Sequence, residues 1–228
     1  MNRNKNAIMK AIDLLNEFEL QAAIFDLDGT LLDNNYYHRI SWIAYLKNAG
    51  RNITEEEFNE NMNGRTNHDA VQYIFGKDLS EEKITNITLE KEAVYREMYA
   101  QYIKPVPGLI NLLEFFRNKG LLMAIATSGI QPNIDFMFDH VPIKPYFKAV
   151  INSAHITNGK PDPEIYLKTA STLNVQPEHC LVFEDAVVGI EAAKSAGMKV
   201  VAVATTEDKK ELSNADLIID DYRELMEN

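Results

Sequence analysis

Short apolar runs recur along this chain, and amphipathic segments separate most of them. The apolar runs cover residues 22–27, 121–126, 149–151, 180–183, 200–204 and 217–219. Runs that are apolar at nearly every position are typical of strands buried on both faces, as in a parallel sheet. Helical patterns lie between most of them, for example at residues 109–118, 163–173 and 186–196. This alternation predicts an α/β fold with a doubly wound, Rossmann-like parallel sheet.

The stretch from residue 34 to residue 103 departs from this alternation. It is polar, has no convincing strand, and predicts helices at 36–48, 54–62, 68–75 and 80–99. Ser80 suits the N-cap position of the last of these helices. Linker-like sequences bound the stretch, at Asp33-Asn34-Asn35 and at residues 104–108. We therefore expect a core made of residues 21–33 and 104–228, with a helical cap domain, residues 34–103, inserted after the first strand.

The first twenty residues have a helical pattern of their own. Ile8, Ile12, Leu15 and Phe18 recur at helical spacing, which predicts an amphipathic helix within residues 1–20. We expect this helix to pack on the domain or on a second molecule, and both a monomer and a homodimer stay open. The segment lacks the apolar centre of a signal peptide, and no apolar run reaches the length of a membrane span. The expectation is a cytoplasmic protein with no membrane partner.

Composition and charge narrow the class of partner. Of the 228 residues, 46% are hydrophobic and 25% are charged, which is ordinary for a globular protein. A formal net charge of -11 argues against nucleic acid as a partner, because nucleic-acid-binding surfaces are basic. The protein can still bind a small anion, because salt screens charges more than roughly 8 Å away. Cationic side chains close to the site, and not the net charge, therefore determine whether an anion binds. The one cysteine, Cys180, excludes an intrachain disulfide and favours a reducing compartment.

Two aspartates, Asp26 and Asp28, end the first apolar run. Alternation along an extended chain sends their side chains the same way and turns Leu27 towards the core, and Gly29 permits a sharp turn after them. Two such carboxylates repel each other unless one holds a proton or a cation lies between them, and Mg²⁺ prefers oxygen ligands of this kind. Taken alone, the pattern fits a capped turn with two solvated aspartates at least as well.

Three further segments place polar side chains at or after strand ends. Thr127 and Ser128 follow the second strand, where hydroxyl and backbone N–H groups can hold phosphate oxygens. Lys160 lies in a loop fixed by glycine and proline, and Glu184 and Asp185 end a later strand. Each segment also has an interpretation without a functional site. The hydroxyl pair and the acidic pair could be helix caps, and the lysine could be an ordinary surface residue. Because ligands of doubly wound sheets bind at the carboxyl ends of strands, their common placement favours one site.

These segments resemble the four motifs of the haloacid dehalogenase superfamily, in the group that contains β-phosphoglucomutase. The first motif corresponds to Phe25-Asp26-Leu27-Asp28-Gly29-Thr30, the second to Thr127, the third to Lys160 in Gly159-Lys160-Pro161-Asp162-Pro163-Glu164, and the fourth to Glu184-Asp185. The resemblance runs from about residue 22 to the C-terminus, and the helical insert matches the small cap of this group. Dehalogenases of the superfamily lack the second acid of the first motif, so Asp28 indicates phosphate esters or anhydrides as substrates.

The resemblance implies the course of the reaction. Asp26 attacks phosphorus and forms an aspartyl-phosphate, while Asp28 gives a proton to the leaving oxygen and later takes one from water. Splitting the transfer into two steps makes each of them easier. Lys160 and Mg²⁺ keep Asp26 ionised, and we expect the exclusion of water on cap closure to favour the protonated form of Asp28.

The resemblance also implies the ligands of a metal ion and of the phosphoryl group. Mg²⁺ is held by Asp26, the backbone carbonyl of Asp28 and Asp185, with Glu184 nearby. The phosphate site comprises Gly29, Thr127, Ser128 and Lys160.

Phosphatases and mutases share this core, so residues of the cap must separate them. His38 lies twelve residues after Asp26, as a histidine does in the mutases, and Lys91 resembles a cap lysine of the same enzymes. Mutases hold their second phosphate with an arginine three residues after a glycine, but this position is Asn67 here, and Arg65 lies two residues earlier. On a helix start this shift turns a side chain by about 200°.

We therefore expect a phosphatase that acts on a small phosphorylated metabolite. The cap residues expected to contact this substrate are His38, Arg65, Thr66, Asn67 and Lys91. The alternative is a mutase of the β-phosphoglucomutase type. A non-catalytic phosphate-binding protein is less favoured, because no catalytic group of the four motifs is missing.

Overall fold

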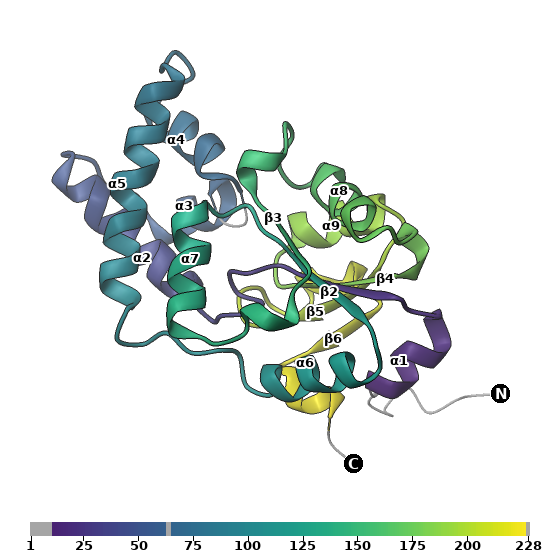
Figure 1. The fold of residues 1–228 in the computed structure, drawn as a ribbon. Helices are drawn as coiled ribbons and strands as arrows, with labels where there is room; N and C mark the ends of the chain where they lie inside the picture. The colour runs from purple at the N-terminus through teal and green to yellow at the C-terminus, as the bar shows by residue number, and fades with distance from the viewer. Residues whose placement is uncertain (1–10, 63–64, 227–228) are drawn as a thin grey trace.

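A single parallel sheet forms the centre of the protein (Figure 1). The computed structural model describes residues 11–62 and 65–226, and in this part of the chain six strands pair in the order β3-β2-β1-β4-β5-β6. The strands are β1 (Ala22–Phe25), β2 (Leu122–Ala126), β3 (Ala149–Ile151), β4 (Cys180–Glu184), β5 (Lys199–Val203) and β6 (Leu217–Ile219). The predicted doubly wound parallel sheet is confirmed.

Helices cover both faces of this sheet. Ala23 and Phe25 of β1 belong to one hydrophobic cluster, to which α6 (Leu109–Asn118) and α7 (Gln131–His140) contribute. Ala22 and Ile24 belong to a second cluster with residues of α8 (Glu164–Leu173) and α9 (Val187–Ser195). Successive residues of a strand point to opposite faces, so an entirely apolar strand supplies both clusters at once.

The helix α1 (Ala11–Phe18) packs on the core, as the sequence predicts for the N-terminal segment. Its residues Ala11 and Leu14 are buried in the same cluster as Phe25. Nζ of Lys199 lies 4.7 Å from the centre of the Phe18 ring, which adds a cation–π contact. Residues 1–10, which include Ile8 and the first half of the predicted helix, lie outside the described residues.

Between β1 and α6, the described residues form four helices, which stand to one side of the sheet (Figure 1). They are α2 (Asn35–Asn48), α3 (Glu55–Asn61), α4 (Asn67–Phe75) and α5 (Glu81–Tyr99). A hydrophobic cluster of their own, with Trp42 and Phe58 among its members, holds them together. Hydroxyl caps begin three of them, since Thr54, Thr66 and Ser80 each accept a hydrogen bond from the backbone N–H three residues on.

The two connections between this helical insert and the core run side by side. Leu32 and Pro105 form an antiparallel bridge, and the Val106 N–H donates to the carbonyl of Leu31 at 3.0 Å. Tyr95 and Tyr99, near the end of α5, are buried in the core cluster of Phe25. The insert is therefore connected to the core by two adjacent segments of the chain, and the end of α5 also packs on the core.

The predicted strands and helices are confirmed, with bounds that shift by a residue or two at several ends. The sequence analysis did not identify α7, whose buried residues Ile134 and Met137 are separated by exposed polar ones such as Asp135 and Asp139. Several short 3₁₀ helices were also not predicted. Across the described residues, no helix combines the length and the apolar character that a transmembrane span requires.

Candidate active site

A cavity opens where the strand order reverses. The chain passes from β1 to β2 on one side and returns to β4 on the other, and ligands of such sheets bind at this switch point. The cavity has a volume of about 80 Å³. Its core wall includes Asp26, Asp28, Thr127, Ser128, Lys160, Glu184 and Asp185. Its opposite wall is formed by the insert and includes His38, Trp42, Arg65, Asn67, Lys91 and Glu92.

Lys160 links two carboxylates at the base of the cavity. Its Nζ lies 2.6 Å from Oδ1 of Asp26 and 2.5 Å from Oε1 of Glu184, and all three side chains are buried. Burial favours the neutral amine, but Asp26 and Glu184 raise the pKa of Lys160 well above its ordinary value. Burial also raises the pKa of Asp26 to about 8, and the charges of Glu184 and Asp28 add to this increase while Lys160 opposes it. One lysine alone therefore does not keep Asp26 fully ionised at neutral pH.

Asp185 is held by three neutral donors. Its Oδ2 accepts from Nδ2 of Asn35 at 2.9 Å and from the hydroxyl of Thr206, and Thr30 Oγ1 lies 3.3 Å from its Oδ1. Gly29 makes room for this carboxylate, because a Cβ at position 29 would lie 1.9 Å from Oδ2 of Asp185. The backbone of Gly29 also has a φ of +75°, which favours glycine. Its N–H donates to Oδ1 of Asn34 at 3.0 Å.

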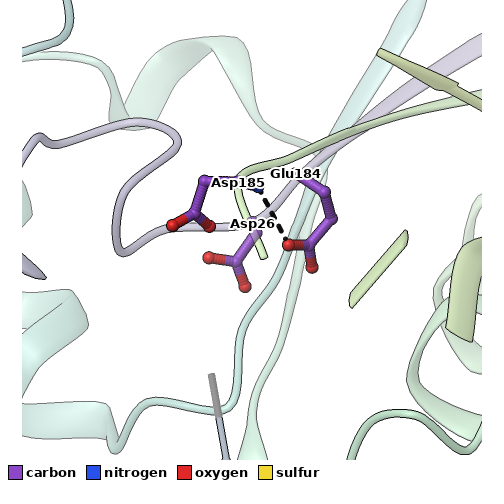
Figure 2. Close-up of side chains that lie close together, drawn as sticks. All are labelled: Asp26, Glu184 and Asp185. Carbon is purple, nitrogen blue, oxygen red and sulfur yellow. Dashed lines mark hydrogen bonds between the residues drawn. The ribbon is translucent and has the colours of Figure 1, made fainter. Parts of the chain in front are cut away.

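The three buried carboxylates fit a divalent cation. Asp26, Glu184 and Asp185 each place an oxygen within 4.8 Å of the others, and Figure 2 shows their carboxyl groups gathered around Asp26. Burial and the neighbouring charges of Glu184 and Asp26 also raise the pKa of Asp185 well above its ordinary value. Such a cluster retains protons unless positive charge is added, and hard oxygen ligands are those that Mg²⁺ prefers.

Glu184 is the most constrained of these carboxylates. Its Oε1 accepts from Lys160 and from the hydroxyl of Tyr166, and its Oε2 accepts from the Asp185 N–H at 3.1 Å. Gly189 on α9 allows this packing, because a Cβ there would lie 2.0 Å from Cδ of Glu184. The arrangement fixes Lys160 and the backbone before Asp185 in place.

Asp28 faces the insert. Nδ2 of Asn34 donates to its Oδ1 at 2.6 Å, and Nε2 of His38 lies 3.2 Å from the same oxygen. Burial disfavours the charged form, but His38 and Asn34 outweigh it and hold the pKa of Asp28 below its ordinary value. Both neighbours thus stabilise the carboxylate of Asp28, and its protonation when the cap closes over a substrate stays a prediction.

The two predicted hydroxyl residues line the cavity differently. Oγ1 of Thr127 accepts from the Gly129 N–H at 2.9 Å, which orders the loop after β2. Oγ of Ser128 is buried, and no hydrogen-bond partner for it occurs among the residues that the structure describes. A buried polar atom without a partner beside a cavity is suited to hold a ligand oxygen.

The predicted cap residues divide into a buried and an exposed group. Lys91 is only 1% exposed, and its Nζ contacts Oε1 of Glu92 at 2.9 Å and Nδ1 of His38 at 3.1 Å. Arg65 is exposed and, like Asn67, lines the cavity. Thr66 instead caps α4, where its hydroxyl bonds both the N–H and the side chain of Asp69.

The helical rotation expected between Arg65 and Asn67 does not occur. The helix α4 begins at Asn67 after its N-cap Thr66, so Arg65 precedes the helix and does not follow its 100° step. Both side chains therefore reach the same cavity. The prediction that Arg65 and Asn67 point in different directions, which favoured a phosphatase over a mutase, is therefore wrong.

Sequence reasoning missed several residues that complete the site. Asn34 and Asn35 were interpreted as linker, although each bonds a carboxylate of the site. Thr206 follows β5, another strand end at the same edge, and this position was the signal available in the sequence. Tyr166, whose hydroxyl bonds Glu184, lies on a helix face that reads as ordinary core.

Comparisons with known proteins agree with this geometry. A sequence profile of haloacid dehalogenase-like hydrolases matches residues 23–203. The "phosphorylated carbohydrates phosphatase" of Thermotoga maritima is 30% identical over 86% of this chain and 91% of its own length. The β-phosphoglucomutase of Bacillus subtilis is 30% identical over 88% of this chain and 89% of its own length. The crystal structure of β-phosphoglucomutase from Clostridium difficile superposes with a TM-score of 0.81 and 29% identity, over 90% of this chain and 93% of that one.

Proposed function

Because this chain belongs to the haloacid dehalogenase-like hydrolases and is a phosphatase, we propose that it hydrolyses a small phosphorylated metabolite with Mg²⁺, through an aspartyl-phosphate on Asp26. The observation that carries the proposal is the contact of Asp26 with Lys160 at 2.6 Å, inside a cluster of carboxylates at the cavity. A nucleophilic carboxylate needs this combination of nearby cation and excluded water.

Each residue of the core wall has a part in this proposal. Mg²⁺ would be held by Asp26, Asp185 and the backbone carbonyl of Asp28, with Glu184 behind them, and when bound it supplies positive charge to the phosphoryl oxygens. Lys160, whose Nζ lies 2.6 Å from Oδ1 of Asp26, balances the charge of this carboxylate. The phosphoryl oxygens would contact Thr127, the unpartnered hydroxyl of Ser128, Lys160 and the turn at Gly29.

The reaction proceeds in two displacements at phosphorus. A carboxylate oxygen of Asp26 forms a bond to phosphorus as the bond to the leaving oxygen breaks. Asp28, which must be protonated at this moment, gives the leaving oxygen its proton. Water then attacks the phosphorus of the aspartyl-phosphate, gives a proton to Asp28, and releases phosphate and the free carboxylate. Positioned acid–base help of this kind contributes typically about 10²–10⁴-fold.

We further propose that the helical insert, residues 34–103, is a cap that closes the cavity over a bound substrate. The paired connections at Asp33–Asn35 and 104–108 would serve as its hinge, since they are the places where the insert joins the core. Apolar residues such as Trp42 and polar ones such as Asn67 line the insert wall, which suits a compact substrate with a few polar groups. The relatives' names point to phosphorylated carbohydrates as the first substrates to test.

A mutase of the β-phosphoglucomutase type is the second candidate. It is favoured by the contacts among His38, Lys91 and Asp28 in the cavity, and by the similarity to the Bacillus subtilis enzyme. A mutase must hold both phosphates of a bisphosphate intermediate. In this cavity the arginine available for the second one is the exposed Arg65.

A panel of phosphorylated metabolites distinguishes the two candidates. We expect the purified protein with Mg²⁺ to release phosphate from at least one sugar phosphate, and chelation by EDTA to abolish this release. We expect little conversion of β-glucose 1-phosphate to glucose 6-phosphate in the presence of a bisphosphate primer. Efficient primed conversion without net phosphate release would replace hydrolysis by mutase activity, and release that persists in EDTA would contradict the metal requirement.

Arg65 provides a prediction about substrate recognition. Arg65→Ala should raise KM for the best metabolite of that panel by about tenfold, the value of one charged hydrogen bond, and leave kcat within about twofold. KM for a small generic ester such as p-nitrophenyl phosphate should change little. Arg51→Ala, a change at an exposed arginine of the insert away from the cavity, is the matched control. Equal changes in KM for both substrates would contradict a recognition role.

A further inference from the structure

One buried amide joins the helical insert to the core beside the cavity. Asn133 lies on α7 and is only 3% exposed. Its Nδ2 donates to Oε2 of Glu92 at 2.7 Å, and its Oδ1 accepts from Nη1 of Arg96 at 2.8 Å. Glu92 and Arg96 lie one turn apart on α5, so they share a face of that helix. Both polar ends of a single core side chain therefore hold the same helix of the insert.

The two partners also fix the orientation of this amide. Rotated by half a turn, the Asn133 amide would direct its oxygen at the carboxylate of Glu92 and its N–H groups at the guanidinium of Arg96. An amide has a donor end and an acceptor end, and only one arrangement satisfies an acid on one side and a base on the other. Asparagine is thus matched to this position by its polarity as well as its size.

Glu92 extends the contact from α7 towards Asp28. Its Oε1 accepts from Nζ of Lys91 at 2.9 Å, and this Nζ lies 3.1 Å from Nδ1 of His38. Nε2 of His38 lies 3.2 Å from Oδ1 of Asp28, a close approach of the two groups that lacks the geometry of a hydrogen bond. A chain of polar contacts therefore runs from the core helix, through the insert, to the proposed acid–base residue.

The buried Glu92–Lys91 pair depends on the Asn133 amide for one of its hydrogen bonds. Glu92 and Lys91 are each 1% exposed, and a buried ion pair is stable only when its remaining hydrogen-bonding positions are filled. Burial opposes the ionisation of Glu92, but Lys91 and His38 lower its pKa to about 2. Lys91 and His38 move with the insert, whereas Asn133 belongs to the core. The Glu92 carboxylate therefore receives the hydrogen bond from Asn133 only when the insert is packed on the core.

We propose that Asn133 is a positioning residue of the phosphatase reaction, which seats α5 on the core so that Glu92 holds Lys91 and His38 opposite Asp28. This inference rests on the proposed function, because it assigns the contact a part in the reaction of Asp28. Asn133 acts through Glu92 and not on the phosphoryl group. Neither Asn133 nor Glu92 belongs to the four sequence motifs.

A reversal of polarity tests the proposal. Asn133→Asp directs a carboxylate at Glu92 and should lower kcat/KM about a hundredfold, as expected for a disrupted pair of charged hydrogen bonds. In the double variant with Glu92→Gln, the amide N–H of Gln at position 92 can donate to one oxygen of Asp at position 133. The other oxygen of this Asp still accepts from Arg96, and the amide oxygen of the Gln still accepts from Lys91. The double variant should recover to within about fivefold of the wild-type kcat/KM.

The single tryptophan supplies a readout that does not depend on activity. Trp42 is 3% exposed and belongs to the cluster of the insert, but it also lines the cavity, and Nζ of Lys91 lies 5.1 Å from the centre of its ring. Its quenching by acrylamide should therefore increase when the insert leaves the core and the cavity opens. Asn133→Asp should increase quenching, and the double variant should restore it. Asn152→Ala is the matched control, since Asn152 is similarly buried and its side chain bonds Gln131 and Ala154, two core residues of the described chain. It should lower the melting temperature without increasing Trp42 quenching.

The outcomes separate this inference from the proposed function. Increased Trp42 quenching in Asn133→Asp, reversed together with kcat/KM in the double variant, would support the positioning role. Unchanged quenching in a folded Asn133→Asp protein, or a double variant as impaired as the single one, would overturn it. A wild-type protein that hydrolyses no phosphate ester with Mg²⁺ would overturn the proposed function, while the quenching series still decides whether Asn133 seats the insert.

Discussion

Asp26→Asn should abolish Mg²⁺-dependent hydrolysis of p-nitrophenyl phosphate and leave the fold intact. The amide is nearly the same size as the carboxylate, so packing among the buried neighbours of Asp26 is kept. It cannot attack phosphorus, and loss of a nucleophile typically lowers kcat by on the order of 10⁴-fold or more. Steady-state kinetics over a range of Mg²⁺ concentrations, with circular dichroism on the same samples, measures both parts of this prediction.

The control for Asp26→Asn is the same substitution at an exposed site. Asp139 lies on the surface of α7, and Asp139→Asn should leave the rate of hydrolysis unchanged. Hydrolysis by Asp26→Asn at a rate close to wild type would require a different nucleophile. A loss of activity that accompanies loss of secondary structure would instead be an effect on folding, and would not count in favour of the proposal.

Asp28→Asn should separate the two displacements at phosphorus. The p-nitrophenolate group leaves with little help from an acid, so phosphorylation of Asp26 should still occur in this variant. Attack by water on the aspartyl-phosphate needs a base, and its loss should slow turnover about 10²–10⁴-fold. The expected trace is a burst of p-nitrophenol that approaches one equivalent of enzyme, followed by a slow steady state.

A poor leaving group is the comparison substrate for Asp28→Asn. With a sugar phosphate, the leaving alkoxide needs its proton in the first step, so the same variant should show no burst. Stopped-flow and rapid-quench measurements on matched enzyme concentrations give both traces. A variant that turns over p-nitrophenyl phosphate slowly and without a burst would contradict the assignment of Asp28 to the second step.

The main architecture follows from short-range sequence features. Entirely apolar strands such as Ala22–Phe25 and the polar residues that follow them predict both a parallel sheet and the edge at which ligands bind. Asp26, Lys160 and Asp185 converge at this edge because the order of strands places β1 beside β4. The helices of the insert could also be predicted from the spacing of their apolar residues, and three of them begin directly after a hydroxyl N-cap residue.

What the sequence could not provide depends on contacts between distant segments. The direction of Arg65 depends on α4 beginning after Thr66, and a difference of one or two residues in a helix start reverses such an argument. The ionisation of Asp28 depends on Asn34 and His38, of which Asn34 had been interpreted as linker. Asn133 has no motif to mark it, and its role is visible only once α5 and α7 lie against each other.

Trapping the phosphorylated enzyme tests the central claim most directly. Asp28→Asn protein, mixed with Mg²⁺ and p-nitrophenyl phosphate and quenched in acid during the burst, is digested and analysed by mass spectrometry. The account predicts one phosphoryl group on the peptide that contains Asp26, and none when Asp26→Asn is added to the same protein. A phosphoryl group on any other residue, or a burst of p-nitrophenol without a phosphorylated peptide, would contradict it.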